Sequence, residues 1–204
     1  MKRLAFWGIL AIASVTTLTV NSQPLLPQDA QPYSADLLAR VRQAAATIPG
    51  AAPLRINYIK FAESHRPMAD IIDGGSKENF VSARTVFQVL YPSGWVMIDS
   101  GMVLIKAAGH TPEHQMVYVR LDSGREYLFI GDVGWTLDNV TQSKLRQALT
   151  MRRINEYAPA LMHQLRWIKD VMDREKLIVI PSHDDQLLQE LAAKQLVSDL
   201  LTAR

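Results

Sequence analysis

The sequence predicts a layered α/β domain, and three observations support this. Short β-rich segments dominate the first half of the chain, helical periodicity dominates the second half, and a fully apolar run, residues 177–180, stands between the last two helical segments. Strands followed by helices that alternate with a strand are typical of domains built from packed layers. The 204 residues are 48% hydrophobic and 21% charged, which is the composition of a globular protein with enough apolar side chains for a core.

The N-terminus has the features of an export signal. Lys2 and Arg3 precede an uncharged run, residues 4–20, and polar residues follow it. A basic start, a short apolar run and small residues before a break are typical of a secretory signal, so we expect residues 1–22 to be a cleavable signal peptide and the protein to be periplasmic or secreted. The alternative is a retained N-terminal membrane anchor, but the run is at the short limit for spanning ~30 Å of hydrocarbon.

Charge and cysteine content exclude several classes of protein. Without residues 1–22 the chain has 20 basic and 20 acidic residues, and a neutral domain lacks the positive potential of a nucleic-acid-binding protein. The absence of cysteine excludes disulfides, a thiol nucleophile and metal sites built on thiolates. After signal cleavage no stable membrane span is expected, and a homo-oligomer is left open.

Local patterns predict the elements of a single domain, residues 34–204, after a proline-containing linker, residues 23–33. A helix is expected from Ser34 to Ile48, where helical spacing of apolar residues ends at a Pro-Gly pair. Turn residues at 92–94 and 122–124 separate β-rich segments. The expected strands are 54–62, 84–91, 95–98, 103–107, 116–121 and 126–130.

The second half of the chain is expected to be mostly helical. Helices are predicted over 141–153 and 159–175, the latter with Pro159 in its first turn. Residues 177–180 have the pattern of a strand buried on both faces. A last helix, capped by Asp184 or Asp185, carries five leucines: Leu187, Leu188, Leu191, Leu196 and Leu200.

Three candidate metal ligands follow three of these strands. His110 comes after 103–107, Asp132 after 126–130 and His183 after 177–180. Loops at the carboxyl ends of strands are where layered α/β proteins build their sites. Imidazole and carboxylate are the ligands that zinc accepts when cysteine is absent. Each residue alone could be a turn or capping residue, but the three together predict a metal site.

Three further residues are candidates for contacts with the ligands or a substrate. His114 lies four residues after His110, Trp135 follows Asp132 at the rim of the expected site, and Asp184 follows His183. Two of them have a simpler interpretation: a surface-loop residue for His114 and a helix cap for Asp184. No catalytic residue is identified.

Segments containing these candidates resemble successive motifs of the metallo-β-lactamase fold hydrolases. They are 109–115 (Gly-His-Thr-Pro-Glu-His-Gln), 127–132 (Tyr-Leu-Phe-Ile-Gly-Asp) and 180–184 (Ile-Pro-Ser-His-Asp), and residues 84–101 resemble that family's early hairpin with its Asp-x-Gly turn. The resemblance covers residues 54–184 and implies an αββα sandwich with zinc-dependent hydrolase chemistry. It implies that His110 is the third histidine of the first zinc site, that Asp132 bridges two metals and that His183 completes the second site.

The family's defining signature, His-x-His-x-Asp-His, is missing. Only residues 102–108 separate Gly101 from Gly109, and no His-x-His pair occurs in the chain. Four of seven metal ligands and an intervening α/β segment are therefore absent, which predicts an incomplete sandwich shortened near 101–102. We expect impaired or absent hydrolysis, at most one weakly held zinc, and exposed sheet edges. The alternatives are a non-catalytic remnant that binds a small molecule or a partner, and a hetero-oligomer in which another chain supplies the missing half.

Overall fold

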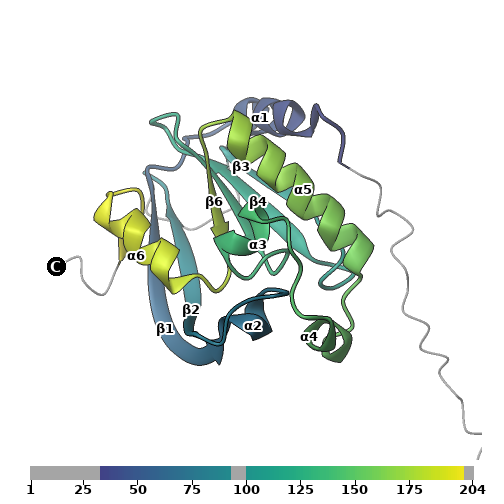
Figure 1. Cartoon of the computed structure of the whole chain (residues 1–204). Helices are drawn as coiled ribbons and strands as arrows, with labels where there is room; N and C mark the ends of the chain where they lie inside the picture. Colours follow the sequence, from purple (N-terminus) through teal and green to yellow (C-terminus); the bar gives the residue numbers. More distant parts are fainter. Residues whose placement is uncertain (1–32, 93–99, 200–204) are drawn as a thin grey trace, which may run out of the picture.

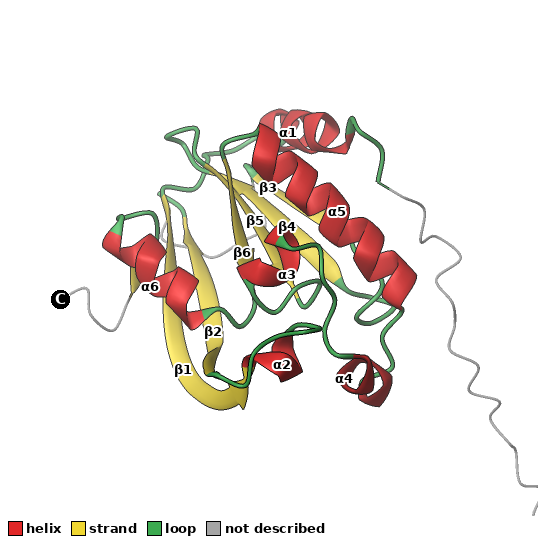
Figure 2. Ribbon diagram, in the orientation of Figure 1, coloured by secondary structure: helices red, strands yellow, loops and turns green. Residues whose placement is uncertain are grey.

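The computed structural model describes residues 33–92 and 100–199, which form two β-sheets with helices around them (Figures 1 and 2). The strands are β1 (Arg55–Pro67), β2 (Asn79–Leu90), β3 (Met102–Lys106), β4 (Gln115–Arg120), β5 (Glu126–Gly131), β6 (Leu177–Pro181) and β7 (Ser198–Asp199). The helices are α1 (Leu37–Thr47), α2 (Met68–Ile71), α3 (Leu137–Thr141), α4 (Ala148–Arg153), α5 (Ala158–Arg174) and α6 (Asp185–Ala193).

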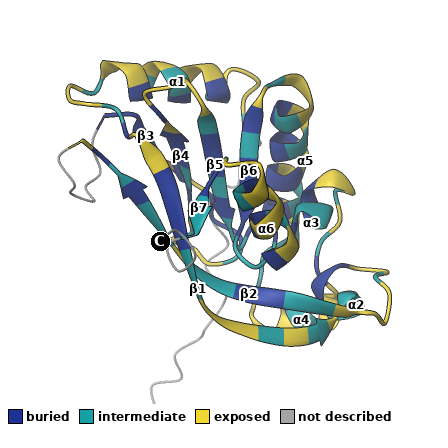
Figure 3. Cartoon of the chain, turned by 90° about the vertical axis from the view of Figure 1, so that its left-hand side faces the viewer, coloured by how far each residue is buried: buried dark blue, intermediate teal, exposed yellow. Residues whose placement is uncertain are grey.

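The order of the strands confirms the layered fold. One sheet has the order β2-β1-β7 and the other β3-β4-β5-β6. A first core lies between the four-stranded sheet and helices α1 and α5, and a second lies among the two sheets and α6. Figure 3 shows that the buried residues gather on the strands of the four-stranded sheet and on the inner side of α5. The arrangement is that of an αββα sandwich, as predicted.

Two elements form for the reasons that the sequence predicts. Helix α5 buries Leu161, Leu165 and Ile168 on the face that packs on the sheet, and a proline stands in its first turn. Strand β6 runs parallel to β5 and is buried along most of its length, as expected for an apolar strand covered on both faces.

The predicted helix over 141–153 is wrong. Helix α3 starts earlier and ends at Thr141, and α4 begins only at Ala148. Ser143 takes a left-handed conformation with φ of 48°, which a helix cannot continue through. The Asn139 side chain holds the intervening loop by donating to the carbonyls of Ile71 and Lys144. Tertiary hydrogen bonds thus override the local helical periodicity.

The last helix is shorter than predicted. It ends at Ala193, and Gln195 is left-handed with φ of 55°, so Leu196 lies beyond the helix. The chain then forms β7, which pairs in parallel with Asn57 and Tyr58 of β1. Leu200 lies outside the described residues.

The first hairpin is longer than predicted. Strand β1 continues to Pro67 and β2 begins at Asn79, with antiparallel pairing across a bulge between Lys60 and Ala62. The residues added to β1, 63–67, are exposed or half-buried, so no apolar alternation marks them in the sequence. The expected strand 95–98, the signal 1–22 and most of the linker 23–33 lie outside the described residues. Within 33–92 and 100–199, no helix is long and apolar enough to cross a membrane.

An ion pair ties α1 to the four-stranded sheet. Arg42 donates from Nε and Nη2 to the two carboxylate oxygens of Glu126, at 2.8 and 2.6 Å, and the Tyr118 hydroxyl donates to the same carboxylate. Burial would raise the pKa of Glu126, but the hydrogen bonds from Arg42 and Tyr118 outweigh it and lower that pKa below its ordinary value. The pair therefore favours the ionised carboxylate in the folded state.

We expect Glu126→Gln to lower the stability of the protein at neutral pH and to have less effect in acid. Because the folded-state pKa of Glu126 is lowered, its stabilising contribution is present above the ordinary glutamate pKa of about 4.3 and is lost as the pH falls through the lowered value. Urea unfolding of both proteins over a pH series measures this. A stability difference between them that stays constant down to the lowest pH would contradict it.

Candidate functional site

The three predicted ligands lie on loops at one edge of the four-stranded sheet. Strands β5 and β6 are parallel, and β3 runs in the same direction because it is antiparallel to β4, which is antiparallel to β5. The carboxyl ends of β3, β5 and β6 therefore meet at one edge. His110, Asp132 and His183 follow those ends, and the structure brings all three together.

The Asp132 carboxylate lies between the two histidine side chains. Its Oδ2 is 3.1 Å from His110 Nε2, its Oδ1 is 3.3 Å from His183 Nε2, and the Ser182 hydroxyl also donates to Oδ1. Burial would raise the pKa of Asp132, but the hydrogen bonds from His110, His183 and Ser182 hold it far below its ordinary value. Asp132 is therefore a carboxylate anion that these neighbours stabilise.

A buried ion pair between Arg146 and Glu156, which was not predicted from the sequence, contacts His110 at Nδ1. Glu156 accepts a hydrogen bond from His110 Nδ1 at 2.7 Å and one from Arg146 Nε at 2.9 Å. The side chains of Arg146 and Glu156 are 1% and 0% exposed. Hydrogen bonds to Asp132 and Glu156 raise the pKa of His110 to about 9, so its imidazolium bridges two carboxylates.

Sequence reasoning missed Glu156 and Arg146 because both come from loops around a short helix that was predicted as part of a longer one. No spacing in the sequence relates either residue to His110, which precedes Glu156 by 46 positions. The arginine also stacks on Trp135, with its guanidinium carbon 4.9 Å from the ring centroid. Arg146 therefore contacts both Glu156, which binds His110, and Trp135, which lies against His183.

His183 is oriented by the backbone of β2. The Ala83 carbonyl accepts a hydrogen bond from His183 Nδ1 at 2.8 Å, which turns Nε2 toward Asp132. Two backbone bonds fix the loop itself: His183 N donates to the Trp135 carbonyl, and Ala83 N donates to the His183 carbonyl. The Trp135 ring meets the His183 ring edge-on, with centroids 5.7 Å apart. Trp135 thus lies beside His183.

His114 contacts the site through the backbone of Asp132. Its Nε2 accepts a hydrogen bond from the Asp132 backbone N–H at 3.0 Å. Burial lowers the pKa of His114, and the nearby charge of His110 lowers it further. Gly131 permits this contact because it is left-handed with φ of 52°, and a Cβ there would stand 2.6 Å from Nε2.

Asp184 caps two helices. Its Oδ1 accepts from Leu187 N of α6 at 3.0 Å, and its Oδ2 accepts from Leu137 N of α3 at 2.8 Å. Burial raises its pKa. Both oxygens are committed to backbone donors, which matches the capping interpretation of this residue better than contact with a ligand or substrate.

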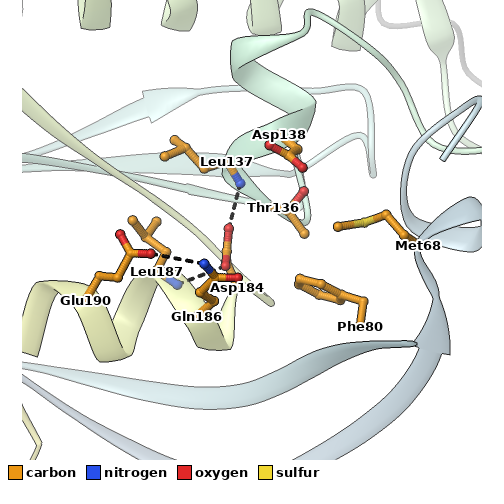
Figure 4. Close-up of a pocket in the computed structure, with 9 residues that line it drawn as sticks. All are labelled: Met68, Phe80, Thr136, Leu137, Asp138, Asp184, Gln186, Leu187 and Glu190. Carbon is orange, nitrogen blue, oxygen red and sulfur yellow. Dashed lines mark hydrogen bonds between the residues drawn. The ribbon is translucent and has the colours of Figure 1, made fainter. Parts of the chain in front are cut away.

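A pocket of about 260 Å³ lies next to this cap (Figure 4). The apolar side chains of Met68 of α2 and Phe80 of β2 face it, and Asp138 of α3 and Glu190 of α6 contribute carboxylates. The full lining is Met68, Phe80, Thr136, Leu137, Asp138, Asp184, Gln186, Leu187 and Glu190. None of these nine side chains is cationic.

The donor chemistry at Asp132 suits zinc, but the geometry does not form a zinc centre. Both histidines have Nδ1 committed to an acceptor and Nε2 directed inward, as metal-binding histidines usually do. The carboxylate, however, lies directly between the two Nε2 atoms and is bonded to both. Across residues 33–92 and 100–199, no group of three or more histidine, aspartate or glutamate side chains is placed to surround a metal ion.

The fold and the order of the motifs define a protein with the metallo-β-lactamase fold. No family model and no curated protein matches the sequence. Among solved structures, the chain is similar to a quorum-quenching N-acyl homoserine lactone lactonase, with a TM-score of 0.54 and 9% identity over 70% of this chain and 97% of that one. It is also similar to an AiiA mutant of B. thuringiensis with N-decanoyl-L-homoserine bound, with a TM-score of 0.53 and 9% identity over 68% and 96%.

A third similar structure is a quorum-quenching N-acyl homoserine lactone hydrolase, with a TM-score of 0.53 and 9% identity over 70% of this chain and 97% of that one. At this level of identity the likeness concerns the fold. The chain is shortened relative to these structures.

Proposed function

We propose that this chain is an exported metallo-β-lactamase-fold protein whose zinc-dependent hydrolysis is impaired or absent. The observation that carries the proposal is the position of Asp132, whose carboxylate is held by two imidazoles and a hydroxyl. A carboxylate engaged in this way must give up these hydrogen bonds before it can bind an ion. The chain also lacks the His-x-His-x-Asp-His signature, whose side chains would supply further metal ligands. Without those ligands, fewer bonds to a metal ion would offset the hydrogen bonds that Asp132 has to give up.

Zinc held at such a site would polarise a carbonyl or phosphoryl group and activate water. His110, His183 and Asp132 are the residues that would hold it, and at most one ion bound weakly is expected. Among the solved structures with a similar fold, one is described as an N-acyl homoserine lactone lactonase and another has N-decanoyl-L-homoserine bound at its active site. An N-acyl homoserine lactone is therefore the first substrate to test.

We expect the purified full chain to retain less than one zinc per molecule after dialysis, and to hydrolyse N-hexanoyl homoserine lactone no faster than the uncatalysed reaction. Elemental analysis and a lactone-opening assay with zinc and then with chelator measure these outcomes. His110→Ala is the site variant, and His163→Ala, on the exposed face of α5, is its matched control. Hydrolysis that zinc raises, and that chelator and His110→Ala abolish while His163→Ala leaves it intact, would overturn the proposal.

A second candidate function is binding of a small molecule without chemistry, and the pocket beside Asp184 favours it. Apolar side chains and unneutralised carboxylates suit a ligand with an apolar body and one cationic group. Thermal unfolding separates the candidates, since a ligand that binds only the folded state raises Tm. A Tm raised by phenethylamine, but by neither phenethyl alcohol nor zinc, would favour this second function.

A further inference from the structure

The polar side chains of the candidate site form one continuous series of contacts, which we call the clasp. Glu156 accepts hydrogen bonds from Arg146 and from His110 Nδ1. The other ring nitrogen of His110 lies 3.1 Å from one oxygen of Asp132, and His183 Nε2 lies 3.3 Å from the other oxygen. The clasp therefore comprises Arg146, Glu156, His110, Asp132 and His183.

The clasp joins segments that are far apart in the sequence and belong to both sheets. Its histidines and its aspartate follow β3, β5 and β6 of the four-stranded sheet, and its ion pair comes from the loops before and after α4. At the other end, His183 Nδ1 donates to the Ala83 carbonyl of β2, which belongs to the three-stranded sheet. One series of side-chain contacts thus connects both sheets with the α4 region.

The polar atoms of the clasp already have protein partners. Both ring nitrogens of each histidine are directed at an oxygen of the protein. The two oxygens of Asp132 face the two imidazoles, and the two oxygens of Glu156 accept hydrogen bonds from Arg146. Polar networks whose members are all satisfied make a fold rigid, whereas partly satisfied ones cost free energy. The contacts of the clasp are therefore those of a structural link.

We propose that the clasp is a metal-independent structural link, in which the candidate zinc ligands hold the two sheets and the α4 region together by their contacts with one another. This role is separate from the proposed function, because the stability of the metal-free protein depends on the clasp whether or not the chain can also bind zinc and hydrolyse a lactone. A test on the metal-free protein can therefore fail or succeed independently of the hydrolysis assay.

A carboxylate that is placed only to bind a metal ion behaves in the opposite way. In the metal-free protein its charge is partly desolvated and lies near no cation, so removal of the charge raises the stability or leaves it unchanged. Asp132 lies instead against two imidazoles and the Ser182 hydroxyl. Asp132→Asn replaces one of its acceptor oxygens by a donating NH₂ group, which cannot accept these hydrogen bonds. The sign of the change in stability therefore distinguishes a structural link from an unused metal ligand.

The test is urea unfolding of the full chain in excess chelator, followed by circular dichroism. We expect Asp132→Asn to raise the equilibrium constant of unfolding at least about tenfold, less than for a fully buried pair because the Asp132 side chain is 27% exposed. Asp173→Asn, which alters an exposed ion pair with Lys169, is the matched control and is expected to stay within about twofold. An Asp132→Asn protein that is as stable as the wild type in chelator, or more stable, would overturn the proposal.

A second variant covers the case in which Asp132→Asn does not fold. His183→Gln keeps a polar side chain at the far end of the clasp and is expected to raise the unfolding constant about threefold or more. Where both variants fold, they remove the same contact, so the double variant is expected to raise the constant at least about threefold less than the product of the single effects. His183→Gln with the stability of the wild type, or single effects that multiply in full, would contradict the link.

Discussion

Replacing Arg146 by methionine is expected to destabilise the folded protein by about 3–5 kcal/mol. The guanidinium is the buried partner of Glu156, whose side chain has no exposed surface. Removal of one member of such a pair leaves a charge without compensation in a region of low dielectric, and His110 then remains as the main partner of the carboxylate. The variant also loses the stacking of the guanidinium on Trp135. Urea unfolding followed by circular dichroism measures the loss.

Two further variants make this expectation specific. Arg146→Met/Glu156→Gln removes the stranded charge and is expected to regain about 1–3 kcal/mol relative to the single variant. Arg174→Met breaks an exposed pair with Asp170 on α5 and is expected to leave the unfolding midpoint almost unchanged. If Arg146→Met were as harmless as Arg174→Met, the buried pair would not stabilise the fold.

Much of the fold could be predicted from local sequence patterns, because the apolar residues that recur at helical or strand spacing are the ones that the structure buries. Helix α5 has an apolar stripe that packs on the sheet, and strands β3 to β6 are short apolar segments between turn residues. The predictions that were wrong, at 141–153 and beyond Ala193, concern segments where distant contacts decide the conformation. Asn139 holds a loop against Ile71, and β7 pairs with β1, and neither contact leaves a local signal.

In the candidate site, too, some residues could be predicted from the sequence and others could not. His110, Asp132 and His183 could be found because each follows a strand within a recognisable motif. The partners that orient them could not. Glu156 lies in the loop after the helix that was predicted over 141–153, and the acceptor for His183 is a backbone carbonyl of β2, which any residue type at that position supplies. Sequence motifs therefore locate the side chains of this site, whereas its protonation and geometry depend on contacts across the fold.

Gly131→Ala is expected to destabilise the protein by about 2–5 kcal/mol. An alanine in the left-handed conformation of Gly131 costs about 1–2 kcal/mol. Its Cβ would also lie 2.6 Å from His114 Nε2, so the ring must move and the Asp132 N–H loses its acceptor, at a cost of about 1–3 kcal/mol. Equilibrium unfolding in urea measures the sum.

A second glycine of the chain separates the two costs. Gly124 is also left-handed, with φ of 80°, but a Cβ there meets no atom within 4 Å. Gly124→Ala should therefore cost only the backbone share, about 1–2 kcal/mol. His114→Ala removes the ring that the new Cβ would strike, so His114→Ala/Gly131→Ala should lose at least about 1 kcal/mol less than the sum of the two single variants. Strict additivity would mean that His114 does not constrain Gly131, and equal losses for the two glycine variants would mean that backbone conformation alone requires the glycine before Asp132.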